Sequence, residues 1–205
     1  MAKGIGYLFL IFCVIVVGVY VSSVLGNLMV PWRFPAASGP SGVEAINFNF
    51  FGSQNPSGKS YITQGYGVTP YSYLYKNHWH DGVDIAASYG ETIYSPDAGT
   101  VLATGNMDNY CYHLGFGKYV AVKDPANDLI LFYAHLGTID VTPNEAIATN
   151  TPIGTVGTTG FETGVHLHFS IFEGSGFAMK VAYGCGPEPI GQDVDPLNYL
   201  GTTYK

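Results

Sequence analysis

The stretch VHLHFSI, Val165 to Ile171, indicates the fold of this chain more clearly than any other segment. In a β-strand, successive side chains point to opposite faces of the sheet. The segment then has an apolar face and a polar face, formed by Leu167, Phe169 and Ile171 and by His166, His168 and Ser170. At about 3.3 Å per residue the two imidazoles stand about 6.6 Å apart, so one can bind a metal ion while the other reaches a ligand or water beside it. The alternative is a pair of ordinary surface histidines on an exposed strand face.

Four further segments have the β-branched and aromatic composition of strands and are bounded by Gly, Pro, Asn or Asp. They are Thr92–Tyr94, Gly99–Ala103, Lys118–Val122 and Leu129–Tyr133. No segment after residue 45 keeps a 3.6-residue apolar period, which disfavours a helical bundle and predicts a mostly β domain built on an antiparallel β-sheet. From Ala178 onward the chain is rich in Gly and Pro, which predicts a loop and a short closing turn near Pro196–Tyr199.

The N-terminal part is long and apolar. No charged residue lies between Gly4 and Trp32, and residues 5–25 are long enough, at about 1.5 Å per residue, to cross a hydrocarbon layer of about 30 Å. With Lys3 in front, this pattern predicts a transmembrane anchor over residues 1–30, a linker over residues 31–45, and a domain over residues 46–205 outside the cytoplasm. The alternative is a cleaved signal peptide, which would make the protein secreted instead of a single-pass membrane protein.

The charge argues against one class of binding partner, and the positions of the cysteines bear on disulfide formation. The residues after Arg33 contain six lysines and all fifteen acidic residues, a net charge of −9, which argues against a nucleic-acid partner because phosphate binding needs clustered cations. Cys13 lies in the apolar segment and counts as a small hydrophobic residue. Cys111 and Cys185 both lie in the predicted exported domain, where they can pair as a disulfide or remain two free thiols.

A second polar cluster reads His80-Asp81-Gly82-Val83-Asp84. Gly82 would allow a bend that brings His80 and Asp84 together instead of about 13 Å apart along an extended strand. A catalytic zinc site uses three nitrogen or oxygen ligands from the protein and leaves a fourth position for water. His80, Asp84 and one histidine of the His166/His168 pair supply such a set. The alternative is that Asp84 only caps a turn.

A third histidine, His135, ends the predicted strand that begins at Leu129. Strand alternation predicts that His135 lies on the side of Leu131 and Tyr133, opposite Phe132 and its even-numbered neighbours. By itself such a histidine is more often structural. Beside a metal site it would be a spare imidazole for general acid–base catalysis at a metal-bound water.

These motifs, in this order, resemble the lysostaphin/LytM family of peptidoglycan metalloendopeptidases. The resemblance covers about Tyr61 to Phe172, the expected catalytic core. The segments that carry it are HDGVDIA (80–86), GFGKYVAV (115–122), YAHL (133–136), IGTVGTTG (153–160) and TGVHLHF (163–169). The family usually has Glu directly after the last of these segments, where this chain has Ser170. Because the metal and catalytic positions are intact, this departure is interpreted as a change in polarity near the site and not as a loss of activity.

The resemblance implies the role of each residue. The zinc ligands would be His80, Asp84 and His168, with one Zn²⁺ per chain, and the catalytic pair would be His135 and His166. The residues by themselves do not decide between His166 and His168 as the ligand. Of the tyrosines near the first ligand, Tyr73 or Tyr75 is expected to contact substrate.

The implied activity is hydrolysis of peptide bonds in bacterial cell-wall peptidoglycan, in the cross-bridge or the stem peptide, by a metal-activated water. Its partners would be the peptidoglycan peptide and, through the N-terminal helix, the membrane. The rival interpretation is a non-catalytic relative that binds peptidoglycan or regulates amidases. Such relatives typically lose metal ligands, whereas this chain keeps all three.

Two further histidines, His78 and His113, match nothing in the family pattern and are expected to be exposed loop residues.

Overall fold

A computed structural model describes residues 49–51, 60–75, 77–181 and 184–200 of the chain. The predicted anchor, residues 1–30, and the predicted linker, residues 31–45, lie outside the described residues. Within the described ranges, no helix combines the length and the apolar character that a membrane crossing requires.

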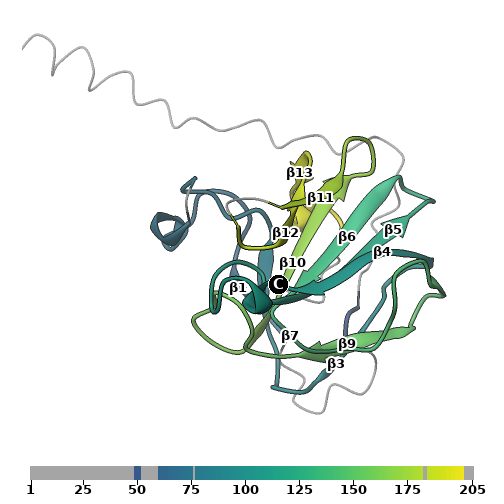
Figure 1. The fold of residues 1–205 in the computed structure, drawn as a ribbon, viewed down its shortest axis with the longest axis horizontal. Coiled ribbons are helices and arrows are strands. Elements are labelled where there is room, and N and C mark those ends of the chain that lie inside the picture. Colours follow the sequence, from purple (N-terminus) through teal and green to yellow (C-terminus); the bar gives the residue numbers. More distant parts are fainter. Residues whose placement is uncertain (1–48, 52–59, 76, 182–183, 201–205) are drawn as a thin grey trace, which may run out of the picture. The chain divides into compact units, whose positions relative to one another are not determined.

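An antiparallel sheet forms the centre of the domain (Figure 1). Its strands lie in the order β1 (Ile62–Gln64), β2 (Val83–Ala86), β10 (His166–Glu173), β6 (Leu129–Ala134), β5 (Lys118–Asp124), β4 (Gly99–Asn106) and β8 (Ala146–Ile147), and β13 (Asp193–Val194) also pairs with β10. A smaller sheet contains β3 (Thr92–Tyr94), β9 (Pro152–Val156) and β7 (Leu136–Ile139). The described helices are short 3₁₀ turns, η1 (Ser72–Leu74), η2 (Met107–Asn109) and η3 (Pro196–Asn198). The predicted mostly β, antiparallel class is confirmed.

The hydrophobic core takes up one face of the main sheet. Leu167, Phe169 and Ile171 of β10 are fully buried in it, as the alternation along the strand predicted. The same core includes Ile93 of β3 and Ile153 of β9, so it joins the main sheet to the smaller one. Because these strands are held on one face by apolar packing, their alternate residues are fixed on the opposite face.

A second, smaller apolar cluster lies on that opposite face. It includes Phe132 of β6 and Phe172 of β10, with Phe116, Phe177 and Cys185 packed against it. His166, His168 and Ser170 follow the same alternation as Phe172 along β10, and all three are buried. The polar site is therefore built at one end of a face whose other end is apolar.

The C-terminal segment contains the predicted closing turn, η3 at Pro196–Asn198, but differs from the predicted loop before it. Strands β11 (Ala178–Val181) and β12 (Pro187–Ile190) form a two-stranded antiparallel hairpin, and β13 pairs with β10. The prediction of a loop was wrong because Pro normally argues against a strand. Pro187 and Pro189 are two residues apart, so their nitrogens lie on the same side of β12 and both can point away from β11.

Candidate metal centre and active site

The main sheet brings three donor atoms from distant parts of the chain to one point. Strands β2 and β10 pair in a register that places Asp84 directly opposite His168, and His80 lies just before β2, where it forms a β-bridge with Gly67. Asp84 Oδ1 is 3.2 Å from His80 Nε2 and 3.0 Å from His168 Nδ1, and the two nitrogens are 3.1 Å apart. All three residues are buried and form a group that could hold a metal ion. The structure thus brings together the predicted ligand set.

Gly82 permits this convergence by close packing. A β-carbon on Gly82 would lie 2.5 Å from the Phe169 carbonyl oxygen, 2.7 Å from Ser170 Oγ and 2.9 Å from His168 Cε1. Gly82 is not among the residues with a left-handed backbone. The chain nevertheless bends at Gly82, as the sequence predicted, and the missing side chain leaves room for β10 to approach β2.

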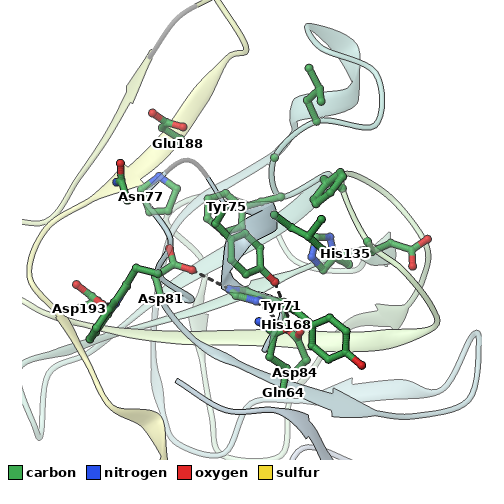
Figure 2. A pocket seen from close by; sticks show the side chains of 18 of the residues that line it. Gln64, Tyr71, Tyr75, Asn77, Asp81, Asp84, His135, His168, Glu188 and Asp193 are labelled. Carbon is green, nitrogen blue, oxygen red and sulfur yellow. Dashed lines mark hydrogen bonds and ion pairs between the residues drawn. The ribbon is translucent and has the colours of Figure 1, made fainter. Parts of the chain in front are cut away.

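In His80 and in His168, the ring nitrogen that faces away from the common point contacts another polar atom of the protein. His80 Nδ1 donates to the Gly65 carbonyl oxygen at 2.7 Å, because a carbonyl only accepts, and this leaves the His80 Nε2 lone pair facing Asp84. His168 Nε2 lies 2.8 Å from Ser170 Oγ. It also lies 3.4 Å from Asp81 Oδ1 (Figure 2). A proton on His168 Nε2 would leave the Nδ1 lone pair facing the same point.

The charges of the cluster are strongly coupled. Burial by itself raises the pKa of Asp84, but hydrogen bonds from His168 and His80 outweigh it and hold the pKa well below its usual range. Burial lowers the pKa of His168, yet the Asp81 and Asp84 carboxylates reverse this effect and raise it to about 9. Without a metal, His168 therefore binds a proton at neutral pH, and a cation has to displace that proton.

The donor set fits zinc. Two imidazoles and one carboxylate are a ligand set of catalytic zinc sites. At zinc–ligand distances of about 2.0–2.1 Å, tetrahedral ligand atoms lie about 3.3 Å from one another. The observed separations of 3.0–3.2 Å are close to this value.

His135 lies beside the cluster, but not by the alternation that the sequence suggested. The prediction placed it on the side of Leu131 and Tyr133, which are in the main core. His135 instead has a left-handed backbone (φ 58°), which turns its ring to the opposite face, 5.0 Å from the ring of His166 and 5.7 Å from that of His168. The left-handed backbone has a local cause, since His is among the residues more often found in that conformation.

His135 and His166 have the same hydrogen-bonding arrangement. His135 Nδ1 donates to the Thr159 carbonyl oxygen at 2.8 Å, and His166 Nδ1 donates to the Gly164 carbonyl oxygen at 2.7 Å. Each ring thus leaves Nε2 without its proton in the neutral form, and His166 Nε2 lies 3.4 Å from Asp84 Oδ1. Burial, together with the neighbouring His168 and His166, lowers the pKa of His135 to about 3. His135 is therefore neutral near pH 7, and its Nε2 carries a lone pair.

A groove of about 660 Å³ opens over these side chains (Figure 2). Its lining includes Tyr75, whose ring stacks on His80 at 5.3 Å and whose hydroxyl donates to Gln64 Oε1 at 3.2 Å. Tyr73, the other tyrosine expected at the substrate, is 68% exposed and is not part of the lining. His78 and His113 are exposed loop residues and lie outside the metal group, as expected.

Sequence reasoning missed one wall of the groove. The β12 residues Glu188, Pro189 and Ile190 line it, together with Asp193. No signal in the sequence pointed to them, because the C-terminal segment resembled a loop. The segment 114–116, which belongs to the loop between β4 and β5, also lines the groove.

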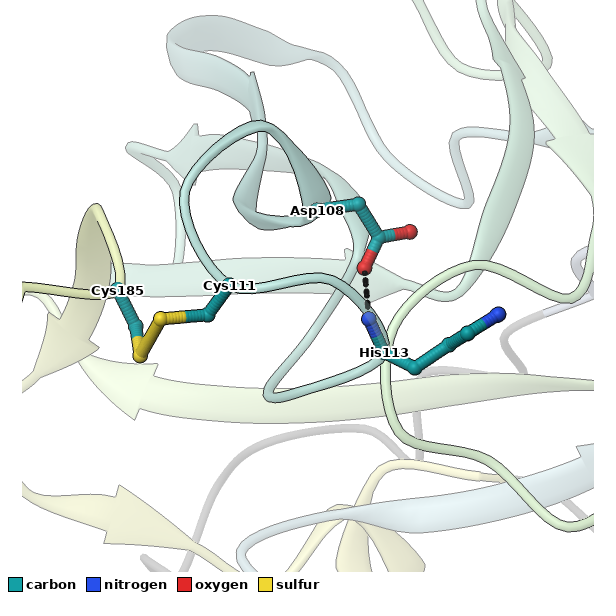
Figure 3. The surroundings of a disulfide bond; sticks show 4 residues. All are labelled: Asp108, Cys111, His113 and Cys185. Atoms are coloured by element: carbon teal, nitrogen blue, oxygen red, sulfur yellow. Dashed lines mark hydrogen bonds between the residues drawn. A yellow bond between two sulfur atoms is a disulfide. The ribbon is translucent and has the colours of Figure 1, made fainter.

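A disulfide joins these two walls. Cys111 in the β4–β5 loop is bonded to Cys185, which lies just before β12 (Figure 3). In the same loop, Asp108 accepts hydrogen bonds from the backbone N–H groups of His113 and Gly160, both at 3.0 Å. The loop is thus fixed both to the C-terminal hairpin and to the segment that holds His135.

Comparison with known proteins identifies the family. The profile of Peptidase family M23 matches residues 78–180, about half of the chain, and this range contains the three candidate metal ligands as well as His135 and His166. The chain belongs to peptidase family M23. The resemblance to the lysostaphin/LytM enzymes is thereby confirmed, and M23 peptidases are zinc-dependent.

Three members of the family illustrate the range of similarity. Peptidoglycan DD-endopeptidase ShyA of Vibrio cholerae is 33% identical over 45% of this chain and 20% of its own length. Murein hydrolase activator NlpD of Escherichia coli is 29% identical over 58% of this chain and 25% of its own. The catalytic domain of a mutant of the prophage-encoded M23 protein EnpA from Enterococcus faecalis matches with a TM-score of 0.54 and 26% identity, over 77% of this chain and 100% of that domain. The chain therefore spans a quarter or less of these two curated relatives.

Proposed function

We propose that this M23 protein is an active zinc endopeptidase that hydrolyses peptide bonds of bacterial peptidoglycan, in the cross-bridge or the stem peptide. The observation that carries the proposal is the convergence of His80 Nε2, Asp84 Oδ1 and His168 Nδ1 within 3.2 Å of one another, beneath a groove. Bound zinc supplies a Lewis acid that polarises a carbonyl and lowers the pKa of water.

The two remaining histidines move protons. His135 is neutral near pH 7 and presents Nε2 to the site, so it can accept a proton from the attacking water and later give it to the leaving amine. His166 presents Nε2 beside Asp84, where a protonated ring can donate a hydrogen bond to a developing oxyanion. The Nδ1–H of each ring is held by a backbone carbonyl, which fixes the orientation of both groups.

The proposal is tested with the full-length chain purified in detergent. Zinc content and peptide release from purified peptidoglycan are measured for the unaltered chain, His168→Ala and His135→Ala. We expect His168→Ala to lose both zinc and hydrolysis. His135→Ala should keep zinc and lose hydrolysis by about 10²–10⁴-fold, the usual contribution of a general acid–base group.

A second candidate function is activation of a separate murein hydrolase, which the similarity to NlpD favours. The same experiment separates the two. If the unaltered chain binds zinc and peptidoglycan but releases no peptide, and instead increases the activity of an added murein hydrolase, the activator role replaces the proposed one.

We also propose that residues 1–30 tether the domain to the membrane on its extracytoplasmic side. The support is the uncharged, apolar sequence described above. Cell fractionation with and without alkaline carbonate extraction tests this. Release of the full-length chain by carbonate would contradict an integral anchor.

A further inference from the structure

Asp108 lies outside the groove lining and contacts none of the five site residues, yet it connects to one of them through a single peptide group. Its Oδ2 accepts the Gly160 N–H at 3.0 Å. The carbonyl of that same peptide group is Thr159 C=O, which accepts His135 Nδ1–H at 2.8 Å. The sequence of contacts is therefore carboxylate, peptide group, imidazole.

The peptide group is held firmly in this orientation. The Thr159 hydroxyl accepts a hydrogen bond from Lys118 N at 2.9 Å and donates one to the Leu136 carbonyl oxygen at 2.9 Å. Gly160 adopts φ 77° and packs so tightly against Gly117 that a β-carbon on Gly160 would overlap the Gly117 nitrogen. The Thr159–Gly160 peptide thus has little freedom to rotate away from either partner.

We propose that Asp108 is a positioning residue that orients and polarises His135 through the Thr159–Gly160 peptide group. A carboxylate on the N–H side of an amide draws the amide dipole toward it, which makes the carbonyl oxygen a stronger acceptor because linked hydrogen bonds reinforce one another. The stronger acceptor keeps the His135 proton on Nδ1 and turns Nε2 to the site. It also stabilises the ring once Nε2 has taken up a proton.

The arrangement performs, across one peptide unit, what a carboxylate in direct contact does for a catalytic histidine. The proposal rests on the proposed role of His135 in proton transfer. Its structural alternative is that Asp108 only caps its own loop, where it also accepts the His113 N–H at 3.0 Å (Figure 3).

The test compares Asp108→Asn with Asp124→Asn in the full-length chain. Asp124 is a suitable control because it also accepts two backbone N–H groups, from Ala126 and Asn127, at a turn that is not in the groove lining. Four quantities are measured: zinc content, kcat for peptidoglycan hydrolysis, KM for the same reaction, and the ¹⁵N signals of the histidine rings in labelled protein.

We expect Asp108→Asn to keep zinc and KM, to lower kcat by about 10- to 100-fold, the range for groups that orient a ligand from outside, and to shift the His135 Nδ1 signal. Asp124→Asn should change neither kcat nor that signal. The proposal is overturned if the His135 signal is the same in Asp108→Asn as in the unaltered chain, or if Asp124→Asn lowers kcat equally.

If Asp108→Asn does not fold, the geometry that the proposal requires can still be tested in the unaltered chain. Its His135 ring must carry the proton on Nδ1, and the Gly160 amide must be protected from hydrogen exchange. A ring protonated on Nε2 or a rapidly exchanging Gly160 amide contradicts the relay. Because these signals do not depend on turnover, failure of the relay is distinguishable from failure of the proposed hydrolase function.

Discussion

Gly82 and Ser170 both contact His168 and together fix the position of its ring. Ser170 Oγ lies 2.8 Å from His168 Nε2, and the missing side chain at Gly82 provides the space in which both residues fit. A ligand ring that is held by its outer nitrogen presents its other nitrogen to a metal in one orientation. The serine at the position where the family usually has Glu therefore has a defined contact.

Gly82→Ala should destabilise the fold and weaken zinc binding, because the added methyl group overlaps the Phe169 carbonyl and the His168 ring. We expect a loss of about 1–3 kcal/mol in the free energy of unfolding, typical of overpacking, measured by urea denaturation. Gly164→Ala is the matched control, since nothing lies within 4 Å of its β-carbon. Equal effects of the two substitutions would show that Gly82 is not a packing constraint.

Ser170→Ala should lower zinc affinity by about 10- to 100-fold, the usual effect of removing a partner of a metal ligand. The measurement is competition with a chelator of known affinity at constant pH. Ser170→Thr keeps the hydroxyl and should retain more of the affinity than Ser170→Ala. An unchanged zinc affinity in Ser170→Ala would mean that Asp81, 3.4 Å from the same nitrogen, is sufficient to hold the ring.

The sequence predicted correctly on which face of the sheet the β10 side chains lie, but it placed His135 on the wrong face. Alternation holds within a regular strand, so His166, His168 and Ser170 could be placed on one face from sequence. His135 follows the last residue of β6, and its left-handed backbone interrupts the alternation. A conformation that several residue types can adopt leaves no unique mark in the sequence.

At the scale of elements, the groove is formed by segments that are far apart in the chain. The β4–β5 loop and β12 both line it, and the Cys111–Cys185 bond joins them across 74 residues. Sequence reasoning found both cysteines but left their pairing open. It could not assign β12, because a proline-containing ribbon of four residues resembles a loop until its partner strand is known.

Reduction of this disulfide should destabilise the domain by up to about 4 kcal/mol, because a closed loop of this length restricts the unfolded chain. Urea denaturation of the full-length chain with and without a thiol reductant measures the change. The same reductant should have no effect on Cys111→Ser, which already lacks the bond. A reductant effect of equal size in Cys111→Ser would show that the bond is not its cause.

At the scale of the whole molecule, two buried histidines limit stability from opposite sides of the pH range. His168 has a raised pKa of about 9 when no metal is bound, so its stabilising contribution is full below pH 6.5 and is lost as pH rises through about 9. His135 has a lowered pKa of about 3, so its contribution is full above pH 6.5 and is lost as pH falls from there toward about 3.

The chelator-treated chain should therefore have its highest free energy of unfolding near pH 6.5 and lose stability toward pH 9. Added zinc occupies the His168 nitrogen that otherwise takes up the proton, so the decline on the alkaline side should disappear. Urea denaturation between pH 5 and 9.5, with and without zinc, measures both effects. An alkaline decline that persists at saturating zinc would contradict the assignment of His168 as a ligand.

The alternation of side chains along β10 also limits which substitutions, insertions and deletions this protein can tolerate. From His166 to Ile171, the odd-numbered positions of the strand pack the main core, whereas the even-numbered positions hold the polar site, so the two sets can be substituted independently. A deletion or insertion of one residue inside the strand would exchange them, burying imidazoles in the interior and placing apolar side chains beneath the groove. Variation in length is therefore confined to the turns on either side of this strand.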